Sequence, residues 1–454
     1  MTLRRTAEEI GRTAAGPRTL PALGQQRTLS APCALDTVLD NGLRVIAVQR
    51  SAVPMVELRL TVPFGGTDRT HAARAELLAA TLLSGTPRRD RLEIDRALAM
   101  VGGDLYAGAD SEHLSVSGSG LASRLDVLLD VLGDALTSAS YTDTEVIKER
   151  TRLAERIMMR RSRPNTIARE ALQRRRYGDH PVTREVPEAD DVATVAPAAL
   201  RTLHGHSVVP RGAVLVVVGD LTPEYIVDAV DSALHGWQSA RSAVKLAPLP
   251  GLTGADLKLV DRPGSVQSQL RLSAQAVPRT DERYPAVELA NLIFGGYFSS
   301  RWVENIREHK GYTYAAQSEL EHTSNQATFF AETDTASEVT AAALLETRYE
   351  LGRIALVPPD ESEVDNARNY AVGELTIAMS SQSGLANQLR MLATAGLGLE
   401  WLRTHSARLQ AVTPTQVAEA AREFLAPARF MGVVVGDAER LAGPLAALGG
   451  VELP

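Results

Sequence analysis

The alternation of apolar and polar residues along this chain predicts strands and amphipathic helices. In the first half, residues 42–48 and 56–62 are rich in Leu, Val and Ile, as β-strands are, and a helix is expected at about residues 73–83. A further helix with one face in the core is predicted by leucines at i, i+3 and i+4 spacing: Leu125, Leu128, Leu129, Leu132 and Leu136. The first half therefore combines strands with core-facing helices.

The second half repeats this order. Strand-like runs at residues 257–260 and 269–273 precede a helix expected at about residues 286–294. The tripeptide Leu-Arg-Leu at residues 58–60 returns at residues 270–272, an offset of 212 (270 − 58). A second core-facing helix is indicated by the stripe Val364, Ala367, Ala371 and Leu375.

Each half also ends on a similar strand. Residues 214–220 and residues 431–437 both finish with Val-Val-Val-Gly-Asp, and their glycines, Gly219 and Gly436, are offset by 217 (436 − 219). Two offsets this close over so long a distance indicate that one α/β unit was duplicated.

A chain of 454 residues is too long for one ordinary core, because domains usually run about 50–200 residues. We expect a polar lead-in at residues 1–34, a first domain at residues 35–240 and a second domain at residues 256–454. The intervening linker, residues 241–255, contains a run punctuated by Pro and Gly.

Composition narrows the function classes. The 48 Lys and Arg against 55 Asp and Glu give a formal charge of −7, which argues against nucleic acid as the partner because phosphate binding needs a clustered cationic surface. Cys33 is the single cysteine, so no disulfide framework or thiolate metal site is expected. No apolar run approaches the ~18 residues of a membrane span, and the lead-in lacks the apolar centre of a secretory signal. We therefore expect a soluble cytoplasmic protein.

The strongest functional signal lies at residues 295–314, with the sequence GGYFSSRWVENIREHKGYTY. A glycine turn precedes a predicted helix that carries Trp302, Val303 and Ile306 on one face, and Gly311 breaks that helix before a predicted strand. The pattern places Arg307 on the last turn of the helix and Tyr314 on the strand. A guanidinium and a phenol held close together can both donate hydrogen bonds to one peptide carbonyl.

This motif resembles the second-half signature of the pitrilysin/insulinase-type metallopeptidases, also called inverzincins, and the resemblance extends from about Leu35 onward. It implies an α+β fold of two duplicated domains, each a mostly antiparallel sheet with helices packed on it. It also implies that Arg307 and Tyr314, seven positions apart (314 − 307), grip a peptide substrate. Arg301, on the same motif, is expected to support the helix instead.

Catalytic members of that family carry a His-x-x-Glu-His motif whose two imidazoles bind zinc and whose Glu is the general base. The motif lies just before a Gly-Thr pair, here residues 85–86, and counting back aligns it with Glu-Leu-Leu-Ala-Ala. Glu76 and Ala80 thus occupy the histidine positions and Ala79 the position of the base. The resemblance implies that this chain has no catalytic residue of its own.

The third zinc ligand of the family would fall on Arg156 (80 + 76), or on Glu155 if the alignment slips by one residue. A carboxylate without its imidazoles cannot hold zinc, and an arginine in the vacated position would repel a dication. We expect Arg156 to pair with Glu76 instead. His204 and His206 could face the same way on an extended segment, but two lone histidines are more often structural. We therefore expect no metal in this chain.

A cationic run between residues 148 and 176 leaves two interpretations open. It has eleven Lys and Arg against Glu149, Glu155 and Glu170. If part of the run lined a substrate chamber, acidic peptides would be preferred. The alternative is a solvated helical face that pairs with the acidic surface of a partner.

A chain that keeps the Arg and Tyr but lacks zinc ligands is similar to the non-catalytic subunit of heterodimeric bacterial family members, and of the mitochondrial processing peptidase. The resemblance implies a homologous zinc-bearing partner subunit that holds the zinc, and a peptide substrate, possible examples being the leaders of ribosomally made peptides. The alternative is a structural or assembly protein of the same fold without a proteolytic role.

Overall fold

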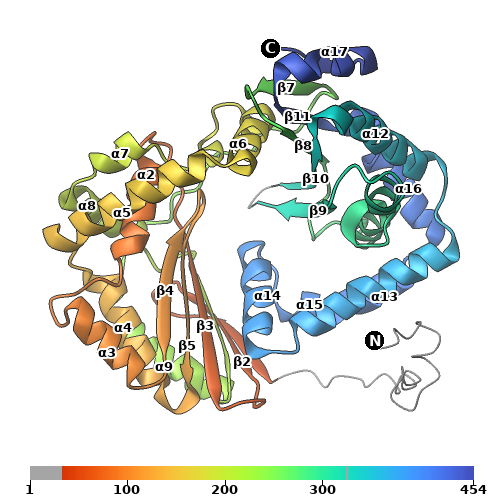
Figure 1. The fold of residues 1–454 in the computed structure, drawn as a ribbon. Helices are drawn as coiled ribbons and strands as arrows, with labels where there is room; N and C mark the ends of the chain where they lie inside the picture. Colours follow the sequence, from red (N-terminus) through yellow and green to blue (C-terminus); the bar gives the residue numbers. More distant parts are fainter. Residues whose placement is uncertain (1–32, 324–325) are drawn as a thin grey trace, which may run out of the picture. The chain divides into compact units, whose positions relative to one another are not determined.

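The first half of the chain builds a six-stranded mixed sheet. The computed structural model describes residues 33–323 and 326–454, so the expected lead-in lies outside the described residues except for its last two. In spatial order the strands are β1 (Ala34–Val38), β2 (Arg44–Gln49), β6 (Val214–Gly219), β3 (Met55–Pro63), β5 (His113–Leu121) and β4 (Asp104–Ala109). Among the described strands of this sheet, β2 and β6 pair in parallel and the other neighbours pair antiparallel (Figure 1).

The second half builds another six-stranded sheet. Its order is β12 (Val451–Glu452), β7 (Leu257–Asp261), β11 (Met431–Gly436), β8 (Gln267–Gln275), β10 (Ala327–Ala336) and β9 (Ala316–His322). Five strands follow the order of their counterparts in the first sheet, and the registers agree: Leu58 lies opposite Val217, and Leu270 lies opposite Val434. The predicted duplication and the mostly antiparallel α+β fold are confirmed.

Helices cover one face of each sheet because their apolar stripes need a surface to bury. The first half contributes α2 (His71–Thr81), α3 (Arg91–Ala99), α4 (Leu125–Ser138), α5 (Asp143–Arg161), α6 (Pro164–Tyr177), α7 (Ala189–Ala193), α8 (Pro197–Ser207) and α9 (Pro223–Leu234). All five leucines of the predicted stripe lie on α4 and are buried. The α4 helix therefore buries its leucine face in the core of the first half.

The second half contributes its own set of α-helices. They are α10 (Tyr284–Asn291), α11 (Arg301–Val303), α12 (Thr340–Leu356), α13 (Glu361–Ala378), α14 (Gln382–Thr394), α15 (Leu399–Ala411), α16 (Pro414–Phe424) and α17 (Ala438–Leu448). Two π-helical segments, η3 (Leu292–Gly296) and η4 (Glu304–His309), flank α11. Single 3-10 turns occur at η1 (Ala122–Arg124), η2 (Pro181–Thr183), η5 (Ser337–Val339) and η6 (Pro427–Arg429). In the part of the chain that the structure describes, no helix is both long and apolar enough to cross a bilayer.

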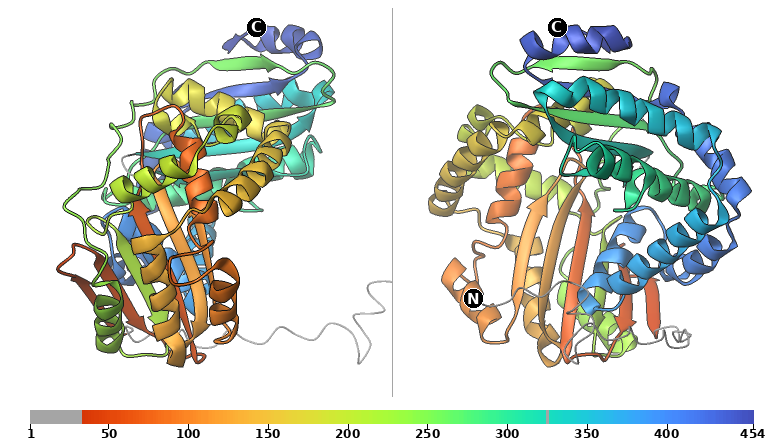
Figure 2. Two further views of the ribbon diagram at one scale, coloured as in Figure 1. Left: turned by 90° about the vertical axis from the view of Figure 1, so that its left-hand side faces the viewer. Right: turned by 45° about the vertical axis from the view of Figure 1, so that its right-hand side comes forward.

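The two halves exchange one helix each. The first-half helix α6 packs Ala168 and Leu172 on the second sheet, against Phe330, Val433 and Val435. The second-half helix α14 packs on the first sheet, over strands β6 and β3, and Figures 1 and 2 show this blue helix against the strands of the first half. Its contact surface comprises Leu385, Ala386, Leu389, Leu392 and Ala393 on Ile46, Val48, Val216 and Val218. Each sheet is thus covered on its second face by a helix from the other half.

A buried arginine fixes each exchanged helix in the same way. Arg59 on β3 donates to the backbone oxygens of Leu58 and Gly118 and, at 2.8 Å, to Oδ1 of Asn387 on α14. Its counterpart on β8 is Arg271, at the predicted repeat offset. It donates to the oxygens of Leu270 and Thr333 and, at 3.3 Å, to Oδ1 of Asn165 on α6. The duplication therefore preserved an interaction as well as a strand order.

The expected linker lies between α9 and β7, where the described chain has neither helix nor strand from residue 235 to residue 256. His180 Nε2 lies 3.0 Å from the backbone oxygen of Ala247, which fixes one point of this segment to the loop after α6. The domain boundaries themselves stay a prediction.

Candidate functional site

The helix predicted before Gly311 is present, as α11 followed by the wider π turns of η4. Trp302, Val303 and Ile306 are buried as predicted, and the Trp302 ring stacks on Phe294 with centroids 5.3 Å apart. Arg307 lies in η4 with one third of its side chain exposed. The apolar face thus anchors the segment and leaves Arg307 toward solvent.

Tyr314 does not lie on a strand, contrary to the sequence prediction. Strand β9 begins only at Ala316, and Tyr314 is 95% exposed in the bend before it. Gly311 turns the chain with φ +64°, and the hydroxyl of Thr313 donates to the backbone oxygens of Ala315 and Asp334 while accepting from the Ala315 N–H. These side-chain bonds replace strand pairing because a Thr hydroxyl competes for the same backbone groups.

The two arginines of the motif have different surroundings. Arg301 is buried and donates at 2.7 Å to each carboxylate oxygen of Glu363, on α13, and to the backbone oxygen of Val357. Arg307 has its guanidinium carbon 4.2 Å from the centre of the Phe298 ring and its Nε 3.4 Å from the carboxylate of the neighbouring Glu308. Arg301 therefore stabilises the fold, whereas the contacts of Arg307 are an aromatic ring and a partly exposed neighbouring carboxylate.

Arg307 and Tyr314 lie on the two sides of the turn at Gly311, but their side chains are not joined. Among the interactions of the described residues, no hydrogen bond links the two side chains. A substrate carbonyl reaching both would have to bring them together, as catalytic hydrogen bonds often tighten only in a complex.

The vacated zinc positions lie on α2, which packs against α5. The prediction that Arg156 pairs with Glu76 is wrong. The partner of Glu76 is Arg160, whose Nη1 lies 3.7 Å from Oε1 of Glu76. Arg160 is one helical turn beyond Arg156, so the same face of α5 supplies both charges. Burial raises the pKa of Glu76, and the charges of Arg160 and then Arg156 oppose that rise.

These residues do not fit zinc. Ala79 and Ala80 carry methyl groups that offer no donor atom and no proton acceptor, and Ala79 is packed in the first core. The arginines beside Glu76 would repel a dication. Over residues 33–323 and 326–454, no three His, Cys, Asp or Glu side chains are grouped as a metal site. The expectation that the chain binds no metal remains a prediction.

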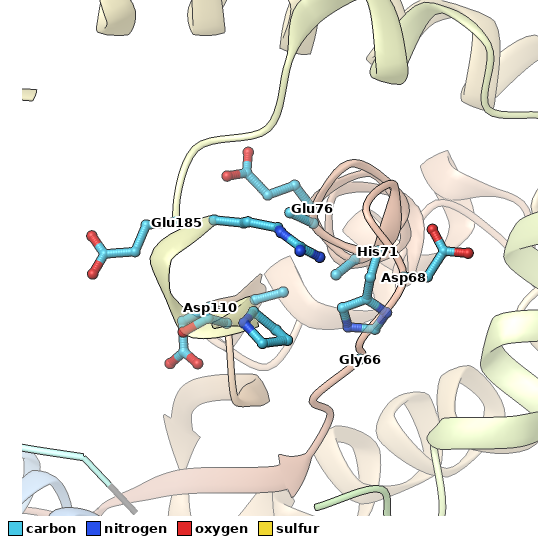
Figure 3. A pocket seen from close by; sticks show the side chains of 12 residues that line it. Gly66, Asp68, His71, Glu76, Asp110 and Glu185 are labelled. Atoms are coloured by element: carbon cyan, nitrogen blue, oxygen red, sulfur yellow. The ribbon is translucent and has the colours of Figure 1, made fainter. Parts of the chain in front are cut away.

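A small pocket adjoins Glu76, at the start of α2 (Figure 3). Its polar walls include Asp68, His71, Asp110 and Glu185, so His71 and Glu76 share it although the helical period sets them about 140° apart. The polar atoms have protein partners: Asp68 accepts from the Thr70 N–H, Asp110 from the Glu112 N–H, Glu185 from Arg169, and His71 Nε2 lies 2.7 Å from the Phe64 oxygen. Burial lowers the pKa of His71. The polar side chains of this pocket therefore hold neighbouring parts of the protein together.

His204 is structural, as expected, and it does not lie on the extended segment that metal binding with His206 would have required. It lies on helix α8, with Nδ1 2.7 Å from the Tyr141 hydroxyl and Nε2 2.9 Å from the Leu136 oxygen. Both ring nitrogens are therefore occupied, which leaves none for a metal.

Much of the cationic run is bound within the protein. Arg169 and Arg176 both pair with Glu321 on β9, at 2.7 and 2.6 Å. Arg161 lies 3.0 Å from Glu188, and Arg175 lies 3.1 Å from Glu452. These arginines join α5 and α6 to their neighbours, so they are not a free cationic surface for acidic peptides.

Sequence reasoning missed two neighbours of the candidate site. Arg160 could have been found, because it follows Arg156 by four residues on a predicted helix and shares its face. Phe298 was inside the quoted motif, but nothing in the spacing shows that an aromatic ring nine residues before Arg307 contacts it. That contact depends on how the chain turns between η3 and α11.

Two family models match the chain. One, described as "Insulinase (Peptidase family M16)", matches residues 44–190, and the other, "Peptidase M16 inactive domain", matches residues 194–370. An uncharacterized zinc protease of Mycobacterium tuberculosis is 26% identical over 408 residues, covering 88% of this chain and 92% of the relative. One of Streptomyces coelicolor is 24% identical over 407 residues, covering 88% of each.

Solved structures share the fold. The crystal structure of a peptidase M16 inactive domain from Pseudomonas fluorescens is similar with a TM-score of 0.80 and 21% identity, covering 89% of this chain and 98% of that one. A protease from Helicobacter pylori gives a TM-score of 0.81 at 16% identity, covering 90% of this chain and 100% of that one. At these identities the likeness concerns the architecture alone.

Proposed function

Because the chain belongs to the M16 (insulinase/pitrilysin) peptidase family, we propose that it is the non-catalytic, substrate-binding subunit of a heterodimeric zinc metallopeptidase. The observation that carries the proposal is chemical. Methyl groups stand at Ala79 and Ala80, where a catalytic member needs a general base and a histidine ligand, and an Arg160–Glu76 ion pair adjoins them.

The second half supports a retained role in substrate binding. Arg301 is engaged in a buried ion pair, whereas Arg307, six residues later, contacts an aromatic face and an exposed neighbouring carboxylate among the described residues. Tyr314 is almost wholly exposed on a bend that Thr313 fixes. A descendant with only a structural purpose has no need of a solvent-accessible cation and phenol at these positions.

In the proposed complex this chain grips the peptide backbone. The Arg307 guanidinium and the Tyr314 hydroxyl donate hydrogen bonds to a carbonyl of an extended substrate, and a charge-assisted bond fixes its position and polarises it. Zinc and the general base belong to the homologous partner. Neither chain alone then cleaves peptides efficiently.

The first test measures zinc and activity. The purified chain should contain far less than one zinc per molecule by elemental analysis and should not cleave peptides, whereas adding the zinc-bearing partner should produce cleavage that a chelator abolishes. Stoichiometric zinc together with cleavage by this chain alone would contradict the proposal.

The second test concerns the clamp. Arg307→Ala should lower kcat/KM of the reconstituted pair by about 100-fold, the size of a lost oxyanion-type donor, and Tyr314→Phe by about tenfold, the size of one lost hydrogen bond. Matched controls are Arg422→Ala on the exposed side of α16 and Tyr225→Phe on α9, which should leave activity unchanged. Full activity in both clamp variants would leave the residues without this role.

The structural or assembly alternative predicts a different outcome of the same experiments. Under that alternative the chain co-purifies with its partners from native cells, but no combination cleaves peptides and the two clamp substitutions have no effect. Retention of a partly exposed Arg307 and an exposed Tyr314 favours the substrate-binding proposal.

A further inference from the structure

We infer that Phe298 is a positioning residue for Arg307: its ring supports one face of the guanidinium and leaves the N–H edge directed to a peptide carbonyl. The inference rests on the proposed function and extends it by a residue that touches the clamp without taking part in its hydrogen bonds.

The backbone before α11 determines where Phe298 lies. Gly295 and Gly296 end η3 in close contact with neighbours, since a Cβ at Gly295 would lie 2.9 Å from the Trp302 ring and one at Gly296 2.8 Å from the Leu292 side chain. The chain then becomes extended at Tyr297, with φ −146° and ψ 169°. Side chains of an extended segment alternate in direction, so the next residue points away from Tyr297.

Tyr297 and Phe298 accordingly have different neighbours. The Tyr297 ring stacks on Tyr370 of α13 with centroids 5.1 Å apart, which ties the loop to the second core. A hydrogen bond of 3.0 Å from the Ser300 N–H to the Tyr297 oxygen closes the turn before α11. Phe298 is 60% exposed and does not belong to the core cluster that the described residues of the second half form around Trp302. The loop is therefore anchored by Tyr297 and presents Phe298.

The contact with Arg307 is close. The guanidinium carbon lies 4.2 Å from the Phe298 ring centre, whereas the other cation–ring contacts of the described residues measure 5.0 to 5.7 Å. The second contact of Arg307 is with Glu308, whose side chain is half exposed, so that ion pair is weak in water. The aromatic face is thus the contact that orients the guanidinium.

Orientation matters because the guanidinium is planar and its N–H bonds lie in that plane. A ring stacked on one face leaves these donors free while it restricts rotation of the long side chain. Without the ring, Arg307 samples many rotamers, and binding a carbonyl must first order it. Phe298 therefore lowers the entropic cost of gripping the peptide without changing the charge that does so.

The test uses the full chain and a fluorescein-labelled synthetic peptide of unstructured, mixed sequence, with binding read by fluorescence anisotropy. Phe298→Ala should weaken binding by about three- to tenfold, as expected for loss of a cation–ring contact, and Phe298→Tyr should retain it. Tyr349→Ala removes an aromatic side chain of similar exposure on α12 and should have no effect. In a Phe298→Ala, Arg307→Ala double variant, the Phe298 substitution should cost nothing further.

A second readout is independent of function. In the NMR spectrum of the chain, the Nε–H resonance of Arg307 should be displaced by the Phe298 ring current, should move to the position of an exposed arginine in Phe298→Ala, and should stay displaced in Phe298→Tyr. In the reconstituted pair, Phe298→Ala should raise KM more than it lowers kcat.

The outcomes separate the two ideas. If Arg307→Ala weakens peptide binding but Phe298→Ala does not, or if the Arg307 resonance is unmoved by Phe298→Ala, the inference about Phe298 is wrong and the proposed function stands. If Arg307→Ala itself leaves binding and activity unchanged, the proposed clamp is wrong, and the inference fails with it even where the resonance moves.

Discussion

Two glutamates of this protein show how the surroundings set the behaviour of one chemical group. Glu76, on α2, occupies one of the vacated zinc positions and is partly buried, and burial raises its pKa above the usual 4.5. Glu363, on α13, accepts two hydrogen bonds from Arg301, and these bonds lower its pKa below the same value. The first carboxylate is retained at a cost in stability, whereas the second supports the helix that carries Arg307.

The pH dependence of stability should therefore differ in sign between these two residues. The raised pKa means that Glu76 stabilises the folded state most below 4.5 and that this contribution is lost as pH rises through the folded-state pKa. Glu76→Gln, which has no proton to lose, should raise Tm relative to the unsubstituted protein at about pH 7.5 and should match it at about pH 4. The stabilising contribution of Glu363 is present above pH 4.5 and is lost as pH falls, so Glu363→Gln should lower Tm at about pH 7.5.

Thermal unfolding of both variants at both pH values measures these changes in Tm. A lower Tm for Glu76→Gln at neutral pH would mean that the pairing of Glu76 with Arg160 outweighs the effect of burial.

At the scale of elements, the turn at Gly311 connects the helix of Arg307 to the bend of Tyr314. Gly311 has φ +64°, and a Cβ there would meet nothing within 4 Å, so its requirement for glycine is one of backbone conformation and not of space. Gly373, inside α13, also has open space around it, but its φ is not positive. The two glycines therefore form a natural pair for comparison.

Gly311→Ala should destabilise the protein by about 1–2 kcal/mol, because an L residue resists the left-handed region. Gly373→Ala should instead stabilise it by about 0.5–1 kcal/mol, because alanine loses less backbone entropy in a helix. Urea unfolding of the two variants measures both changes. Gly311→Asn, which tolerates the left-handed region, should fall between them; a loss as large as that of alanine would place the cost elsewhere in the loop.

The elements themselves were largely predictable from sequence. The apolar runs of β2 and β3 reflect strands that are buried on both faces, and the leucine stripe of α4 reflects a helix with one buried face; both patterns are visible in residues close together in the sequence. The segment at residues 312–314 was predicted wrongly as a strand. Its aromatic and β-branched residues favour a strand, but the Thr313 hydroxyl competes for the backbone and bends it.

At the scale of the whole molecule, the described chain is one compact unit from Cys33 to Pro454 although its sequence contains a duplication. The reason lies in the exchanged helices. The apolar face of Val216 and Val218 in the first sheet is covered by α14, and that of Val433 and Val435 in the second sheet by α6. Neither half covers both faces of its own sheet.

Cutting the chain in the linker, between Gly251 and Leu252, should consequently give two fragments that need each other. Expressed together they should co-purify as a folded complex, because each supplies a helix and an asparagine to the other. Expressed separately, each should aggregate or bind a hydrophobic dye, since an apolar sheet face is exposed. Size-exclusion chromatography and dye fluorescence measure this. Two soluble, monomeric fragments would show that each half covers its own sheet.

The sequence by itself determined that the zinc-binding side chains of the motif are absent and that the same order of strands occurs twice. A methyl group at Ala79 or Ala80 cannot bind zinc in any fold, and the repeated Leu-Arg-Leu and Val-Val-Val-Gly-Asp runs specify the same strands in both halves. Only the tertiary structure decided which distant groups meet: Arg160 and not Arg156 at Glu76, Phe298 under Arg307, and Asn387 on Arg59. Side-chain chemistry and strand periodicity are properties of a few consecutive residues, whereas these contacts depend on turns and helix positions that the whole packed molecule sets.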